Sequence, residues 1–105
     1  MELKQYQYVL KVAELKSITK AAEELYITQP SLSHYIAKIE EELGALIFNQ
    51  GTTPISLTPA GEVYIETAKM ILGLDCRMKE NIRDIVDSRK GVITIGMAFV
   101  TYLFG

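Results

Sequence analysis

The sequence has 105 residues, 49% of them hydrophobic and 23% charged, with a formal net charge of −2. This size allows one small domain with an extension rather than two domains, and the composition is too apolar for a disordered chain. The single cysteine, Cys76, excludes an internal disulfide, and neither a signal peptide nor a membrane-spanning run is recognisable, so we expect a cytoplasmic protein.

Two short amphipathic helices are predicted at the start of the chain. The first ends near Lys16, and its apolar positions recur at helical spacing: Leu3, Tyr6, Leu10 and Ala13. Ser17 is a good N-cap for a second helix, which extends to about Leu25. Its apolar face includes Ala21 and Ala22, and such small residues permit close packing.

A third helix is predicted after the turn at residues 26–28. Thr28 can cap it, and Pro30 is acceptable because the first turn of a helix has N–H groups without partners. Gly44 provides a left-handed stop. Four apolar residues at spacings of four, three and four form one stripe: Leu32, Ile36, Ile39 and Leu43.

A small β wing is predicted next, at about residues 49–58. Turn-forming residues are dense at positions 49–54, and the alternating piece Ile55–Thr58 follows them.

One long helix is predicted from residue 59 to about residue 88. Its apolar residues repeat every seven positions with others between them, and the set is Tyr64, Ile71, Leu74, Met78, Ile82 and Ile85. About thirty residues of helix extend roughly 45 Å, more than a domain of this size can cover. We therefore expect these residues to form a dimer interface rather than to pack on their own domain. Residues 89–91 should break the helix, and Gly91–Gly96 has the composition of a strand.

The second and third helices, at about residues 18–37, form a helix-turn-helix whose third helix is placed to enter the major groove of DNA. With the apolar stripe turned inward, Pro30, His34 and Ala37 face outward. Gln29 can pair bidentately with adenine, and serines can bond to bases or phosphates. The expected DNA-binding residues are Gln29, Pro30, Ser31, Ser33, His34, Lys38, Gln50, Thr52, Thr53 and Thr58.

The charge distribution opposes this interpretation. Five Lys and seven Glu occur up to Thr58, whereas DNA-binding domains usually carry a basic face. Three of the acids, at positions 40–42, lie near the far end of the third helix from the predicted DNA contacts. The positive end of that helix dipole and two linked copies are therefore expected to supply the affinity.

Several blocks of the sequence resemble one family in their order and spacing. They are Ser17–Leu25, Thr28–Ser33, Ile39–Gly44, Ile47–Phe48 and Leu57–Gly61. These blocks resemble the N-terminal signature of the LysR-type transcriptional regulators. The resemblance extends through most of the chain.

The resemblance implies a mainly α fold, in which a winged helix-turn-helix domain at residues 1–58 is followed by a dimerising linker helix at 59–88. Residues 91–105 would then begin an effector-binding domain whose remainder is missing, so we expect a fragment. The implied partners are double-stranded promoter DNA with an inverted repeat, and a second copy of the chain, with tetramers in the complete protein. A small-molecule effector would bind only the missing domain.

Two positions depart from the family pattern. Gln50 stands where the family commonly has an arginine at the start of the wing, which removes a charge from that contact. Lys16 stands where the family commonly has glycine.

Other interpretations compete with DNA binding. An enzyme is disfavoured because no phosphate loop or nucleophile with its base is present, and no cofactor is expected. His34 lacks nearby metal ligands, which favours a surface or phosphate contact. Ser31 has a structural alternative at the helix start, and Lys38 has one as a partner of Glu42. A protein-binding adaptor that has lost its DNA affinity is the stronger rival, because the domain is acidic and has Gln50.

Overall fold

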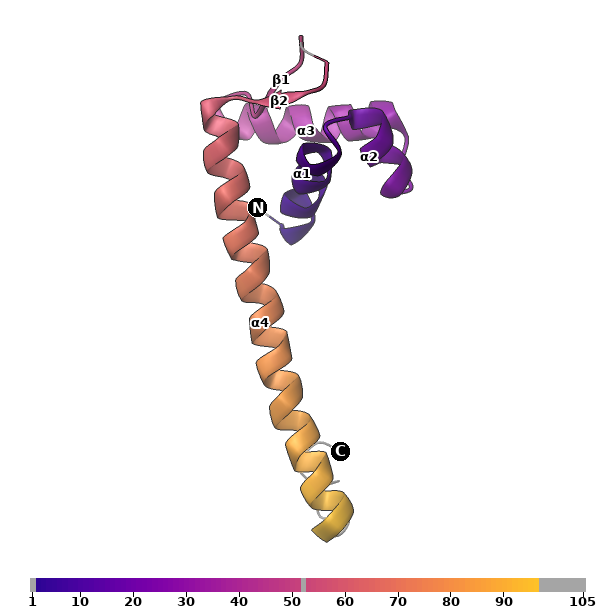
Figure 1. Ribbon diagram of the computed structural model, residues 1–105, viewed down its shortest axis with the longest axis vertical. Helices are drawn as coiled ribbons and strands as arrows, with labels where there is room; N and C mark the ends of the chain where they lie inside the picture. The colour runs from indigo at the N-terminus through magenta and orange to yellow at the C-terminus, as the bar shows by residue number, and fades with distance from the viewer. Residues whose placement is uncertain (1, 52, 97–105) are drawn as a thin grey trace. The chain divides into compact units, whose positions relative to one another are not determined.

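The structure, a computed structural model, describes residues 2–51 and 53–96. The chain divides into two compact units, Met1–Leu72 and Gly73–Gly105. The first unit contains α1 (Leu3–Leu15), α2 (Ile18–Glu24), α3 (Gln29–Leu43) and a hairpin of β1 (Phe48–Asn49) and β2 (Ser56–Leu57). The helix α4 (Pro59–Gly96) begins in the first unit and forms the described part of the second. Figure 1 shows α1, α2 and α3 gathered beside the hairpin.

The helix boundaries follow local signals in the sequence. Ser17 Oγ accepts a hydrogen bond from the Lys20 N–H at the start of α2, and Thr28 Oγ1 accepts one from Ser31 N–H at the start of α3. Gly44 ends α3 in the left-handed conformation with φ 73°. These three predictions are confirmed. Such boundaries can be predicted from the sequence because a cap and the N–H group that it satisfies lie within one helical turn.

The core lies where α1, α2, α3, the wing and the start of α4 meet. α1 packs against both α2 and α3, and β1 pairs antiparallel with β2, with Phe48 opposite Leu57 and Asn49 opposite Ser56. The buried hydrophobic residues are Val9, Val12, Ala21, Ala22, Leu32, Ile36, Ile39, Ile47, Phe48, Tyr64, Ile65 and Ala68.

Two predicted apolar faces differ from the observed ones. In α1 the fully buried residues are Val9 and Val12, whereas Leu10 is half-buried, because neighbours on two sides of the helix cover more than one face. In α3 the stripe is buried at Ile36 and Ile39 but not at its end, where Leu43 is 42% exposed.

The end of the long helix also differs from the prediction. α4 continues to Gly96, so the expected stop near residue 88 and the expected strand at 91–96 are both wrong for this chain. A strand needs a partner for its N–H and C=O groups, whereas a helix satisfies them internally and tolerates Gly91 at a cost of about 1 kcal/mol. Residues 97–105 lie outside the described residues. Within the part of the chain that is described, none of the helices combines the length and apolar character needed to cross a membrane.

Gly61 in the first turn of α4 allows a close approach of two backbones. A Cβ atom at Gly61 would overlap the carbonyl oxygen of Ile47 and lie 3.2 Å from Leu57 Cδ2, whereas one at Gly73 would meet nothing within 4 Å. We predict that Gly61→Ala lowers the free energy of unfolding by roughly 3 kcal/mol. Gly73→Ala, the matched control, should raise it by about 1 kcal/mol, because alanine favours a helix. Urea denaturation at a fixed protein concentration measures both, and equal midpoints for the two variants would contradict the proposed close contact.

Lys16 ends α1 in the left-handed conformation, with φ 55°. The left-handed conformation costs a residue with a Cβ atom about 1 kcal/mol of conformational free energy, whereas it costs glycine almost none. We predict that Lys16→Gly stabilises the chain by about 0.5 kcal/mol after the larger entropy loss of glycine, and that Lys16→Ala does not. If both variants shift the urea midpoint alike, the charge of Lys16 and not its backbone conformation is responsible.

Candidate nucleic-acid interface

The first turn of α3 presents short polar side chains to solvent. Gln29 and Ser31 are exposed, and Ser33 is half-buried. Gln29 Nε2 donates a hydrogen bond to Ser33 Oγ at 3.3 Å, which joins two side chains one helical turn apart. Both therefore lie on one side of α3. A primary amide offers a donor and an acceptor together, which is the pattern that the major-groove edge of adenine requires.

Ser31 takes part in the cap of the same helix. Thr28 Oγ1 accepts a hydrogen bond from Ser31 N–H at 3.2 Å and donates one to Ser31 Oγ at 2.8 Å. The structural role that the sequence left open for Ser31 is therefore present. Because Ser31 Oγ acts as the acceptor in this pair, its own proton can still be donated outward.

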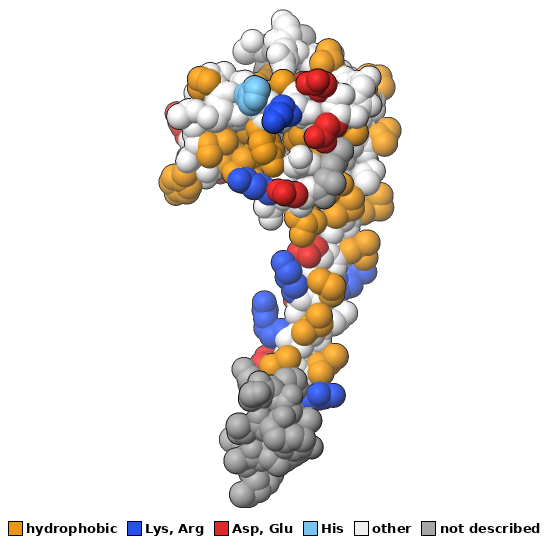
Figure 2. Space-filling view, turned by 180° about the vertical axis from the view of Figure 1, so that it is seen from behind, with side chains coloured by type: hydrophobic (Ala, Val, Ile, Leu, Met, Phe, Trp, Pro, Cys, Tyr) orange, Lys and Arg blue, Asp and Glu red, His pale blue; other side chains and the backbone are white. Residues whose placement is uncertain are grey.

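The outer face of α3 continues with His34, Ala37 and Lys38, which are all exposed, as is Pro30 at its start. In Figure 2, on the face that carries the histidine, Lys or Arg side chains alternate with Asp or Glu side chains. A protein–phosphate contact on this face therefore depends on single cations and on neutral N–H and O–H donors rather than on a basic patch.

The wing lies across a hollow from this helix. The hollow has a volume of 620 Å³ and is lined by Ala37, Glu40, Leu46, Phe48, Asn49, Gln50 and Gly51. Gln50 and Thr53 are exposed, and Thr52 lies outside the described residues. Asn49 was not among the residues predicted to form the site, and its Nδ2 donates to Ser56 Oγ and to the Leu57 carbonyl, both at 3.2 Å. Only its place in a turn-rich segment pointed to it, because its partners lie across the hairpin.

Thr58 has a structural role that was not predicted from the sequence. Its hydroxyl donates to the carbonyl oxygens of Leu46 and Ile47, and it accepts from Gly61 N–H at 2.9 Å. Thr58 is therefore the cap of α4, and its hydroxyl is already occupied. The expected contact of Thr58 with DNA stays a prediction, and in this structure the hydroxyl serves the start of α4.

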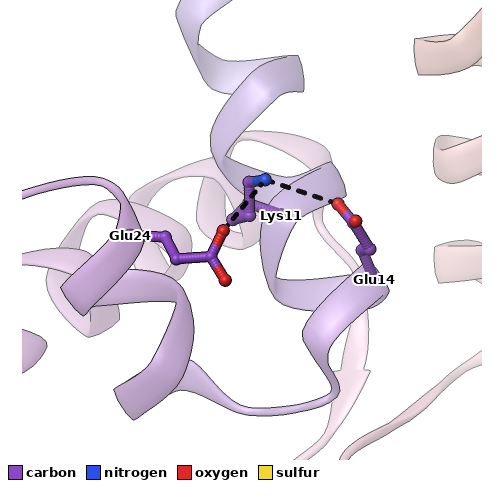
Figure 3. A network of polar contacts seen from close by, with 3 residues as sticks. All are labelled: Lys11, Glu14 and Glu24. Atoms are coloured by element: carbon purple, nitrogen blue, oxygen red, sulfur yellow. Dashed lines mark hydrogen bonds and ion pairs between the residues drawn. The ribbon is translucent and has the colours of Figure 1, made fainter.

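An exposed ion-pair network connects two helices of the first unit (Figure 3). Lys11 Nζ lies 3.5 Å from Glu14 Oε2 and 3.4 Å from Glu24 Oε1, which joins α1 to α2. The negative charges of Glu14 and Glu24 raise the pKa of Lys11 above its ordinary value. Lys11 thus neutralises acids of its own domain, and it adds little positive potential for an outside anion.

The apolar residues of α4 divide into buried and exposed members. Leu74, Met78, Ile82 and Ile85 are between 51% and 60% exposed, and Ile71 is half-buried. Figure 2 shows hydrophobic side chains repeated along the helix. Tyr64 is different: it is only 7% exposed and its ring lies 5.6 Å from the Tyr6 ring, so it packs on its own domain, and its place in a dimer interface stays a prediction. Burial in its own domain also raises the pKa of Tyr64 to about 12.

Comparison with known sequences gives consistent matches. The profile of "Bacterial regulatory helix-turn-helix protein, lysR family" matches residues 3–62. The chain is 39% identical over 97 residues to the transcriptional regulator BudR of Klebsiella aerogenes, covering 92% of this chain and 68% of that protein. It is 38% identical over 110 residues to the uncharacterized HTH-type transcriptional regulator YcgK of Bacillus subtilis, covering 99% of this chain and 33% of that protein. The chain thus spans about a third of the length of YcgK and of several other relatives.

Solved structures match the fold as well. The BenM DNA-binding domain in complex with catB site 1 DNA has a TM-score of 0.80 and 36% identity, covering 84% of this chain and 95% of that one. BenM is a regulator of Acinetobacter baylyi. The CbnR DNA-binding domain in its DNA complex has a TM-score of 0.74 and 32% identity, covering 81% and 98% of the two chains. At these levels of identity the shared winged helix-turn-helix fold and the long helix after it reflect common ancestry.

Proposed function

Because this chain belongs to the lysR family of bacterial regulatory helix-turn-helix proteins, we propose that it is the DNA-binding part of a transcriptional regulator. The observation that carries the proposal is the outward first turn of α3, where Gln29 and Ser33 are paired on a helix whose opposite face is buried. BenM and CbnR, which share this fold, are bound to DNA in their structures. A regulator of transcription works where the chromosome is, so we place it in the cytoplasm.

In this proposal α3 enters the major groove with its N-terminal end first. Gln29 pairs with an adenine edge, and Ser33 donates to a neighbouring base or phosphate. Pro30 and Ala37, which are exposed and small, would contact thymine methyl groups. His34 and Lys38 contact phosphates from the exposed side of the helix.

The wing contributes neutral contacts only. Residues 49–58 contain no charged side chain, so Gln50, Thr52 and Thr53 would donate hydrogen bonds to the backbone without forming ion pairs. Weak non-specific binding follows, because fewer counterions are released from the DNA.

Two copies of the chain would compensate for this weakness. We propose that Ile71, Leu74, Met78, Ile82 and Ile85 cover each other in a homodimer, because so many apolar side chains on one helix are rarely left in water. Two linked readers then bind an inverted repeat more tightly than either alone. Residues 91–105 would lead into an effector-binding domain of the complete regulator, which is the part that binds a small molecule.

An adaptor that binds protein instead of DNA is the second candidate. The acidic first 58 residues and Gln50 favour it, because both reduce attraction to phosphate. An enzyme has less support, because the matching family consists of regulatory helix-turn-helix proteins.

Selection of duplexes from a random DNA pool, at low and then at near-physiological salt, tests the proposal. We expect enrichment of an inverted repeat whose half-sites are about one helical turn apart. If no sequence is enriched and binding disappears as the salt concentration rises, the chain contacts only phosphates. That result would favour the adaptor.

Substitutions in α3 test the named contacts on the selected duplex. Gln29→Ala should weaken specific binding tenfold or more, because a bidentate base contact contributes about 1–3 kcal/mol of discrimination. Ser33→Ala should weaken it less. Glu42→Ala, an exposed change at the other end of the same helix, is the control and should not weaken binding. Equal affinities for Gln29→Ala and Glu42→Ala in a fluorescence titration would exclude Gln29 from the interface.

A substitution in α4 tests the dimer. Met78→Lys places a charge among the exposed apolar residues and should shift the chain toward monomer in sedimentation equilibrium. Glu80→Lys places the same side chain on the opposite side of the helix, about 200° away, and should leave the dimer intact. The interface lies elsewhere if the two variants sediment alike.

A further inference from the structure

Glu40 is a charged side chain inside the protein. It is 6% exposed and, among the described residues, it is the one buried side chain that is polar or charged. It belongs to α3, and its neighbours Glu41 and Glu42 are exposed. Burying a carboxylate is costly unless it gains strong hydrogen bonds, so its partners explain its position.

The partners of Glu40 are two consecutive backbone N–H groups. Glu40 Oε2 accepts a hydrogen bond from Ile47 N–H at 2.7 Å and one from Phe48 N–H at 3.4 Å. No Lys, Arg or His side chain in the described part of the chain forms an ion pair with it. Two N–H groups and no cation therefore hold the carboxylate.

These two N–H groups belong to the start of the wing. Phe48 is the first residue of β1 and pairs with Leu57 across the hairpin. Glu40 also lines the hollow between α3 and the wing, together with Gln50 and Gly51. Its carboxylate thus links the helix proposed to recognise bases to the hairpin proposed to contact the DNA backbone.

The same short segment is held on its other side. The Ile47 carbonyl accepts a hydrogen bond from Thr58 N–H at 2.9 Å and one from Thr58 Oγ1 at 3.2 Å. Thr58 fixes this segment to the start of α4, whereas Glu40 fixes it to α3. The hydrogen bonds of Glu40 join a side chain of the recognition helix directly to the start of the wing, in addition to the packing of Ile47 and Phe48 in the shared core.

We propose that Glu40 is a positioning residue that sets the spacing between the recognition helix and the wing, and with it the extent of DNA that one copy of the chain contacts. This inference rests on the proposed DNA binding. Glu40 touches no DNA itself, since its carboxylate is buried and occupied by Ile47 and Phe48.

Three variants of the full chain test the proposal. Glu40→Ala removes the acceptor, Glu40→Gln keeps an acceptor oxygen without the charge, and Glu41→Ala removes an exposed acid from the next position. We expect exchange of the Ile47 and Phe48 amide hydrogens to be at least tenfold faster in Glu40→Ala than in Glu41→Ala, and largely restored in Glu40→Gln. This measurement needs no DNA, so it is informative even if the chain binds none.

Footprinting on the selected duplex tests the consequence for binding. We expect Glu40→Ala to keep the protection of bases under α3, to lose protection of the flanking backbone under the wing, and to bind about tenfold more weakly. A variant that is merely less folded would lose both protections in the same proportion, which would overturn the proposal. Unchanged amide exchange in Glu40→Ala would overturn it too, whereas a wild-type chain that binds no duplex would overturn the proposed function and leave the exchange result standing.

Discussion

The backbone of Ile47 is the point at which the functional parts of the first unit are joined. Its N–H group is bonded to Glu40 of α3, and its carbonyl is bonded to Thr58 at the start of α4. Gly61 lies against that carbonyl so closely that no other side chain fits. The side chain of Ile47 is fully buried. One residue therefore fixes the recognition helix, the wing and the long helix relative to one another within the first unit, and the proposed DNA-binding surface depends on that junction.

The acidic character of the domain is compatible with a DNA partner because of where the charges lie. Lys11 is paired with Glu14 and Glu24, and Glu40 is buried against backbone donors. The N-terminal end of α3, which carries Gln29 and Ser33, has no acid in its first turn. The positive end of the helix dipole and neutral donors are thus left at the surface proposed to meet DNA. Under the proposed function, so few charges would give one copy little affinity, and the exposed apolar side of α4 would provide the second copy.

The seven-residue repeat in α4 shows what a periodic pattern can and cannot predict. The seven-residue spacing predicted one face of a helix, and Leu74, Met78, Ile82 and Ile85 are indeed exposed apolar residues available to a partner. Tyr64 has the same spacing but lies on the core formed by Tyr6 and its neighbours. Periodicity specifies which residues share a face and not what covers that face. In the first unit, the Tyr6 ring of α1 lies against Tyr64.

The sequence by itself determined the family and the starts and ends of the helices in the first unit, because those depend on short-range rules. Caps at Ser17 and Thr28, the glycine stop at Gly44 and the apolar spacing of α3 act within one or two helical turns, and the motif blocks are contiguous. The tertiary structure alone decided the roles of Glu40 and Tyr64 and the contact of Thr58 with the Leu46 carbonyl, since these partners lie seven or more positions away. The conformation of residues 91–96 was also not decided by their composition. That composition is β-rich and favoured a strand, but these residues belong to α4. A strand forms only where another strand can share its hydrogen bonds, and that condition is a property of the folded neighbourhood rather than of the segment itself.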